Sequence, residues 1–230
     1  QIGQIETAVC IAAYRKSMEN GWCKPIWTQD LVYSIKEAYH PLIVQPVKNS
    51  IDTRKGVLLT GSNASGKSTF LKTVAISAIL AQTINTCPAD YYKACFYRIY
   101  SSMALRDDVE SGESYYIVEI KSLKRILDRS GQYPVLCFVD EVLRGTNTVE
   151  RIAASTQILR SLSNNNMICF AATHDIELTE LLKDHYDNYH FEEEIRDGAD
   201  EFCKQGADKV HNKVSLILFG EISCQMLDII

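Results

Sequence analysis

Eight consecutive residues carry the glycines, the lysine and the serine expected of a loop that binds phosphate. They read Gly61-Ser62-Asn63-Ala64-Ser65-Gly66-Lys67-Ser68 and fit the pattern Gly-x-x-x-x-Gly-Lys-Ser. The glycines let the backbone turn tightly, so that its N–H groups point at phosphate oxygens, while Lys67 is predicted to reach the β- and γ-phosphates. The Ser68 hydroxyl is predicted to bind Mg²⁺. We expect this loop to hold a nucleoside triphosphate with Mg²⁺; the alternative is a glycine-rich turn with an exposed lysine.

A second group of polar residues follows two apolar segments. Asp140 and Glu141 come directly after residues 135–139, and His174 follows residues 167–172. Ligands of open α/β sheets bind at the carboxyl ends of strands, so Asp140 is predicted to hold Mg²⁺ through water and Glu141 to act as general base. If the two strands are neighbours, His174 lies where it can sense the γ-phosphate. The alternatives are a solvated acidic pair and a structural histidine.

The segments that would position these residues alternate between apolar runs and helical patterns. The apolar runs are 56–60, 135–139 and 167–172. Helical patterns cover 67–83, 116–129, 149–163 and 176–183. In the second of these, the apolar stripe is predicted to contain Ile117, Ile120, Leu123 and Leu127. Such alternation predicts an α/β fold with a mostly parallel central sheet flanked by helices on both faces.

The beginning of the chain has a different pattern. Residues 1–20 are expected to form an amphipathic helix that ends at Asn20-Gly21, with Ile2, Ile5, Val9, Ala12 and Ala13 on one face. Residues 22–55 contain three of the five prolines and are expected to form short strands and loops.

Composition limits the class of protein. A net charge of −5 does not favour a general affinity for polyanionic DNA. Cys137 and Cys169 lie inside apolar strands, and the chain has no Cys-x-x-Cys pair, so a reduced cytoplasmic protein is expected. No run of about 18 apolar residues is present, so no membrane span is predicted. The chain begins with Gln1 and is expected to be a piece of a longer protein.

Several classes of phosphate-loop protein fit poorly. Asn212-Lys213 is followed by Val-Ser and lacks the aspartate with which a GTPase reads guanine. A nucleoside kinase does not need the adjacent Asp140-Glu141 pair. That pair, with a histidine on the next strand, indicates the ATPases that act as facing dimers, in which a signature segment of one subunit closes the nucleotide site of the other.

The motifs resemble those of the ATPase domain of the MutS family of DNA mismatch-repair proteins. In order along the chain they are His40-Pro41, Thr60 to Leu71, Cys87-Pro88-Ala89, Asp107-Asp108-x-x-x-Gly112-x-Ser114-x-x-x-x-Glu119, Asp140-Glu141-x-x-Arg144-Gly145-Thr146-x-Thr148 and Ala172-Thr173-His174. Their order and spacing cover residues 40 to about 185. The resemblance implies a phosphate-loop NTPase of the ABC-type class that binds ATP or ADP with Mg²⁺ and hydrolyses ATP.

The resemblance also implies roles for single residues. Ser114 would reach across a dimer interface to the γ-phosphate bound by the partner, although Ser111 to Ser114 could otherwise be a simple helix cap. Asn63 would lie near the γ-phosphate, and Thr69 would contact nucleotide beside Ser68. Arg144, Thr146 and Thr148 would line the dimer interface.

Several positions depart from the family pattern and indicate a divergent branch. Ser62 and Ala64 stand where the family commonly has proline and methionine, and Tyr115-Tyr116 replaces a common Thr-Phe pair. No aromatic residue for stacking on adenine is found near Pro46 and Val47. The expected organisation is a lead-in segment over 1–50, the ATPase domain over 51–198 and an atypical segment over 199–230.

We therefore expect an ATPase domain of a MutS-like protein that acts on mismatched or branched DNA. Its expected partners are a second copy of the chain and, through upstream domains, DNA. One alternative is a slow nucleotide-gated dimerisation switch in a MutS-like protein that acts on recombination intermediates. The other is a transport or chromosome-type ATPase, but those carry Leu-Ser-Gly-Gly-Gln where this chain has Ser111-Gly112-Glu113-Ser114.

Overall fold

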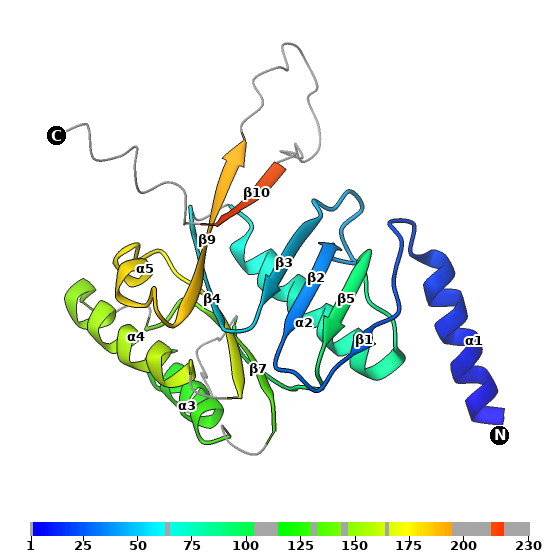
Figure 1. Ribbon diagram of the computed structural model, residues 1–230, viewed down its shortest axis with the longest axis horizontal. Helices are drawn as coiled ribbons and strands as arrows, with labels where there is room; N and C mark the ends of the chain where they lie inside the picture. The colour runs from blue at the N-terminus through cyan, green and yellow to red at the C-terminus, as the bar shows by residue number, and fades with distance from the viewer. Residues whose placement is uncertain are drawn as a thin grey trace, which may run out of the picture.

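The computed structural model describes residues 2–62, 65–103, 115–129, 133–143, 147–163, 166–194 and 213–218. Within them the strands form a six-stranded sheet and a four-stranded sheet. Figure 1 shows α2 (Lys67–Ile84) beside the smaller sheet, with α3 (Tyr115–Leu127), α4 (Thr148–Leu162) and α5 (Glu177–Leu181) grouped together on the opposite side. The alternation of strands and helices along the chain confirms the predicted α/β class.

The larger sheet contains the strands that were expected from the apolar runs. Its order is β10-β9-β4-β8-β7-β6. The strands are β4 (Gly56–Gly61), β6 (Arg98–Ser102), β7 (Val135–Asp140), β8 (Met167–Ala172), β9 (Tyr186–Glu194) and β10 (Lys213–Leu218). All neighbouring pairs are parallel except β10 and β9, which are antiparallel. The sheet is therefore mostly parallel, as predicted.

Both faces of this sheet are covered, because successive side chains of a strand point to opposite faces. In β4, Val57 and Leu59 pack into the core shared with α2, whereas Leu58 packs into the core on the other face. That second core is completed by α3 (Tyr115–Leu127), α4 (Thr148–Leu162) and α5 (Glu177–Leu181). The continuous apolar composition of the strands follows from this two-sided burial.

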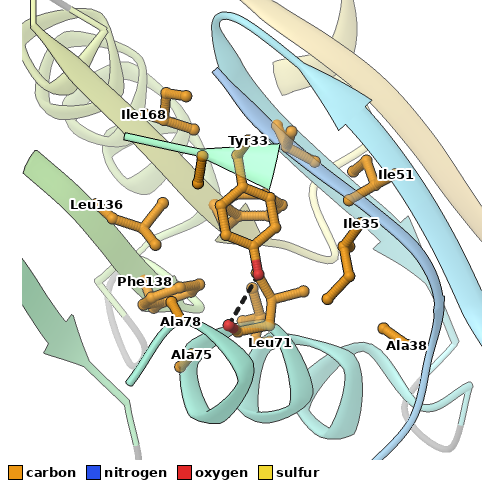
Figure 2. Packing of buried hydrophobic residues seen from close by; sticks show 14 of the residues in the cluster. Tyr33, Ile35, Ala38, Ile51, Leu71, Ala75, Ala78, Leu136, Phe138 and Ile168 are labelled. Carbon is orange, nitrogen blue, oxygen red and sulfur yellow. Dashed lines mark hydrogen bonds between the residues drawn. The ribbon is translucent and has the colours of Figure 1, made fainter. Parts of the chain in front are cut away.

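Three of the four strands of the smaller sheet come from residues 22–55, which were expected to form short strands and loops, and the fourth, β5, follows α2 in the chain. The order of this sheet is β1-β5-β2-β3, formed by β1 (Ile26–Trp27), β5 (Tyr91–Ala94), β2 (Tyr33–Ala38) and β3 (Asn49–Thr53). The central strand β2 is antiparallel to both β3 and β5. Tyr33 of β2 points into the core beside α2, and its hydroxyl donates to the carbonyl of Val74 over 3.0 Å (Figure 2).

The first helix, α1 (Ile2–Ser17), stands at the side of the molecule and buries none of its residues (Figure 1). Its predicted apolar face is exposed in the structure: Ile2, Ile5 and Val9 are each more than half exposed. Arg15 joins it to the rest of the chain by donating to the carbonyls of Ile84 and Asn85. Those carbonyls lie at the end of α2, where backbone acceptors have no intrahelical partner.

Helix α3 is present as predicted, but its buried stripe differs from the predicted one. Ile117 is 41% exposed, although it was expected in the stripe. Leu123 of that stripe is buried, and Ile120 and Leu127 pack against the same core. Glu119 and Ile126 are also buried, and with Leu123 they have the i, i+4, i+7 spacing of a single helix face. The prediction was therefore wrong at Ile117, and it omitted the carboxylate that the buried face includes.

None of the helices in the described parts of the chain combines the length and apolar character needed to cross a bilayer.

Candidate functional site

The loop between β4 and α2 has the tight geometry that its glycines suggest. Gly61 has a φ of +140° and Gly66 a φ of +91°, a region that favours glycine. A Cβ on Gly61 would lie 2.6 Å from the carbonyl oxygen of Phe191, so no larger residue fits there without a shift. Ser65 is buried, and its hydroxyl donates to the carbonyl of Ser62 over 2.9 Å. The described residues at the start of this loop are thus packed closely against β9.

Lys67 places its positive charge at this loop. Its ammonium group donates to the carbonyls of Gly61 and Ser62 over 2.7 and 2.6 Å, and the residue is 5% exposed. Gly66, which precedes α2, forms no side-chain cap on the helix. The N–H groups of the first helical turn and the lysine therefore give this end of α2 a positive character, which suits an anion.

The predicted acidic pair and histidine lie together at the carboxyl edge of the sheet. β7 and β8 are parallel neighbours, with Asp140 opposite Ala172, so the expected adjacency of the two strands is confirmed. Past the strand ends, Nε2 of His174 lies 2.8 Å from Oε1 of Glu141. An ionised carboxylate only accepts hydrogen bonds, so Nε2 carries the hydrogen in this contact. The histidine thereby orients the carboxylate.

Sheet order brings this pair to the same edge as the loop between β4 and α2, which was predicted to bind phosphate. β8 lies between β7 and β4, and Leu59 of β4 is in register with Ala172. The amide of Thr173 donates to the carbonyl of Leu59 over 2.9 Å, which joins the histidine loop to the strand that leads into the phosphate loop. Residues from three separate segments therefore meet where ligands bind in open α/β sheets.

The turn after β7 is held by a residue to which no role was assigned from the sequence. Glu141 and Leu143 have φ values of +58° and +60°, which cost a non-glycine residue about 1 kcal/mol each. Oε1 of Glu119, on α3, accepts a hydrogen bond from the amide of Leu143 at 2.6 Å. Glu119 shares a helix face with Leu123 and Ile126, and this spacing is the sequence signal that could have identified it as buried.

An ion pair between Arg151 and Asp175 was also missed. Arg151 of α4 donates through Nε to Oδ2 of Asp175 at 2.9 Å and through Nη2 to Oδ1 at 2.5 Å. The hydrogen bonds that Arg151 donates to the Asp175 carboxylate raise the pKa of Arg151 above its usual value. Because Asp175 directly follows His174, this two-point contact fixes the histidine loop to α4. No local pattern in the sequence pairs these residues, which are 24 positions apart.

Several predicted site residues fall outside the described part of the chain: Asn63, Ala64, Ser114, Arg144 and Thr146. Ser68 and Thr69 lie on the exposed side of the first turn of α2, and Thr148 is the first residue of α4. Near the expected adenine position, Pro46 is partly buried and Val47 is exposed.

The oxygen donors available for Mg²⁺ fit that ion. Mg²⁺ keeps several waters and binds proteins through one or two oxygen groups, most often carboxylates. Ser68 lies in the first turn of α2, and the partly buried Asp140 is the last residue of β7, at the edge described above. No group of three or more histidine, cysteine, aspartate or glutamate residues suited to another metal occurs among the described residues.

Comparison with known proteins gives a family match over most of the chain. The model of MutS domain V matches residues 57–222. A DNA mismatch repair protein MutS from Pseudothermotoga lettingae is 34% identical over 172 residues, which are 71% of this chain and 21% of that protein. MutS protein homolog 4 from Mus musculus is 33% identical over 184 residues, 74% of this chain and 19% of its own length. The chain thus spans about a fifth of the length of these curated relatives.

Proposed function

Since this chain belongs to the MutS family by its match to domain V, we propose that it binds and hydrolyses ATP within a protein that acts on mismatched or branched DNA. The observation that carries the proposal is the meeting of the phosphate loop with the hydrogen-bonded pair of Glu141 and His174 at one edge of the sheet. A binding loop alone would support only nucleotide binding, whereas an oriented carboxylate beside it supports hydrolysis.

The nucleotide is held by the loop and by the first turn of α2. Backbone N–H groups of residues 61–68 contact the phosphates, and Lys67 exchanges its two carbonyl partners for the β- and γ-phosphate oxygens. Ser68 and Asp140 would hold Mg²⁺, Asp140 through water. When bound, the ion neutralises charge on the β- and γ-phosphates.

Glu141 accepts a proton from the water that attacks the γ-phosphorus, and the products are ADP and inorganic phosphate. The 2.8 Å contact with His174 supports this role, because the imidazole keeps the carboxylate pointing in one direction. His174 itself is placed to respond to the γ-phosphate. The ion pair between Arg151 and Asp175 limits how far the histidine loop can move.

The site is completed by a second copy of the chain. Ser114 contacts the γ-phosphate of the partner's nucleotide, Asn63 and Thr69 contact nucleotide within the same chain, and Arg144, Thr146 and Thr148 line the interface. DNA is bound by domains of the longer protein upstream of this segment. An isolated segment is then expected to bind ATP and hydrolyse it weakly.

The test replaces Glu141 with glutamine in the full-length protein, with and without DNA. Glu141→Gln should bind ATP within about twofold of the wild type but lose turnover by at least about a hundredfold, because the amide cannot take up the proton. Glu180→Gln, at an exposed glutamate of α5, is the matched control and should retain turnover.

Two outcomes would contradict hydrolysis as the function. A wild-type protein without measurable turnover in either condition would exclude the enzyme. A slow rate that Glu141→Gln leaves unchanged would instead indicate a nucleotide-gated dimerisation switch, the alternative expected for a family member that acts on recombination intermediates.

A further inference from the structure

The turn that follows β7 is a strained piece of backbone next to the proposed general base. Glu141 and Leu143 both adopt the left-handed region, with φ values of +58° and +60°. Residues other than glycine enter this region only when surrounding contacts compel them to do so. The direction of the Glu141 side chain depends on this turn, so whatever holds the turn also orients the carboxylate.

Three neighbouring elements contact the backbone of this turn. The amide of Glu141 donates to the carbonyl of Ala172, at the end of β8, over 2.9 Å. Ser155 of α4 donates through its hydroxyl to the carbonyl of Val142 over 3.4 Å. Oε1 of Glu119 accepts from the amide of Leu143 at 2.6 Å. The contact from α3 is the shortest, and it holds the second of the two strained residues.

Glu119, the last residue of the motif that begins at Asp107, is a carboxylate in a buried position. It is 1% exposed and shares a helix face with Leu123 and Ile126, which are 2% and 0% exposed. Removing a carboxylate from water is unfavourable unless the group forms hydrogen bonds, and an apolar side chain could fill this position without that cost. A carboxylate whose oxygen meets a strained amide is therefore best explained by that contact.

We propose that Glu119 is a positioning residue for Glu141. Its carboxylate holds the Leu143 amide, keeps the turn after β7 in its left-handed geometry and so keeps the Glu141 carboxylate facing His174. Glu119 does not touch nucleotide or water in the reaction, and it acts through the backbone of the turn. This inference rests on the proposed ATP hydrolysis for its kinetic consequence, but the contact itself can be tested without it.

The experiment compares Glu119→Ala, Glu119→Gln and Ser122→Ala in the full-length protein. Ser122 is a buried polar residue of the same helix, so its replacement controls for general loosening of α3. The first measurement is hydrogen exchange of the Leu143 amide, without nucleotide. Exchange should rise about tenfold or more in Glu119→Ala. It should stay within about threefold of the wild type in Glu119→Gln, which keeps an acceptor oxygen, and in Ser122→Ala.

The second measurement separates ATP affinity from turnover. Glu119→Ala should lower kcat by about tenfold or more and leave the Kd for ATP within about twofold, because the phosphate loop is not touched. Glu119→Gln should recover most of kcat. A merely structural role would instead change kcat, Kd and thermal stability together, and would do so in Ser122→Ala as well.

Different results would overturn the positioning role and the proposed ATP hydrolysis. If exchange of the Leu143 amide in Glu119→Ala equals that of the wild type, the positioning role is overturned, even when ATP is hydrolysed normally. If the wild type hydrolyses no ATP but the amide is deprotected in Glu119→Ala, the proposed function is overturned and the contact stands. Equal losses of kcat and ATP affinity in Glu119→Ala would overturn the positioning role.

Discussion

Glu141 and His174 lie on the loops that follow the neighbouring strands β7 and β8. Their 2.8 Å contact depends on the backbone between Asp140 and Leu143. Neither side chain is deeply buried, with exposed fractions of 17% and 34%. Their alignment therefore comes from hydrogen bonds and not from close packing. Arg151 on one side and Glu119 on the other fix the two loops to α4 and α3.

Gly61 shows how strictly one residue determines the phosphate loop. Gly61→Ala combines an unfavourable φ with a Cβ that would lie 2.6 Å from a backbone oxygen. We expect a loss of about 1–3 kcal/mol in the free energy of unfolding and at least about tenfold weaker ATP binding. Chemical denaturation and nucleotide titration measure the two effects.

The control for this change is Gly3→Ala, on α1. A Cβ at Gly3 meets no atom within 4 Å, and alanine favours a helix more than glycine does. Gly3→Ala should leave ATP binding unchanged. Equal unfolding free energies and ATP affinities in Gly61→Ala and Gly3→Ala would contradict the tight packing at Gly61.

Among the elements, α2 has the central position. It begins at the phosphate loop and packs between the larger sheet and the smaller one, in a core that contains residues of both (Figure 2). Tyr33, Leu71 and Phe138 meet in this core from β2, α2 and β7. The smaller sheet therefore supports the helix whose first turn is proposed to bind phosphate.

Removing the hydrogen bond from Tyr33 to Val74 tests whether the smaller sheet stabilises α2. Tyr33→Phe removes one buried hydroxyl and leaves the carbonyl of Val74 without that donor, which should lower the free energy of unfolding by about 1 kcal/mol. The phosphate loop lies a full turn or more away, so ATP affinity should change little. Tyr133→Phe, at a 52% exposed ring, should leave stability within about 0.5 kcal/mol of the wild type.

At the scale of the whole molecule, buried tyrosines make the free energy of unfolding depend on pH in the alkaline range. Burial raises the pKa of Tyr33, Tyr92 and Tyr186 well above the usual value. The pKa of Tyr189 is raised to about 12, also by burial. In the unfolded chain these phenols ionise near pH 10. The folded protein therefore binds more protons than the unfolded chain above that pH.

The sign of the effect follows from this difference. The stabilisation that these protonated tyrosines contribute is fully present below about pH 10 and is lost as the pH rises toward 12 and beyond. Phenolate absorbance and circular dichroism, recorded together, should show a fraction of the tyrosines ionising only as the fold is lost. Complete ionisation near pH 10 with an intact circular dichroism spectrum would contradict the burial of these rings.

Much of the fold follows from the sequence because it depends on short-range patterns. The apolar runs 135–139 and 167–172 are typical of strands buried on both faces, and they form β7 and β8. A strand that ends in Asp140 and a neighbour that leads to His174 then predict one shared edge, because parallel strands end together. The family match agrees with the motifs, since both depend on the order of residues along the chain.

Tertiary structure alone decided the contacts that hold the site. Glu119 and Leu143 are 24 residues apart, as are Arg151 and Asp175, and no periodicity links them. The predicted stripe of α3 omitted Glu119, because hydrophobicity excludes a carboxylate from a buried face, whereas the fold pairs Glu119 with a strained amide. The sequence by itself determined the apolar strands at the centre of the larger sheet, the helices that cover them and the place of the glycine-containing loop between β4 and α2. The orientation of the residues proposed to act on the nucleotide was decided by long-range hydrogen bonds, which exist only after the helices have packed on the sheet.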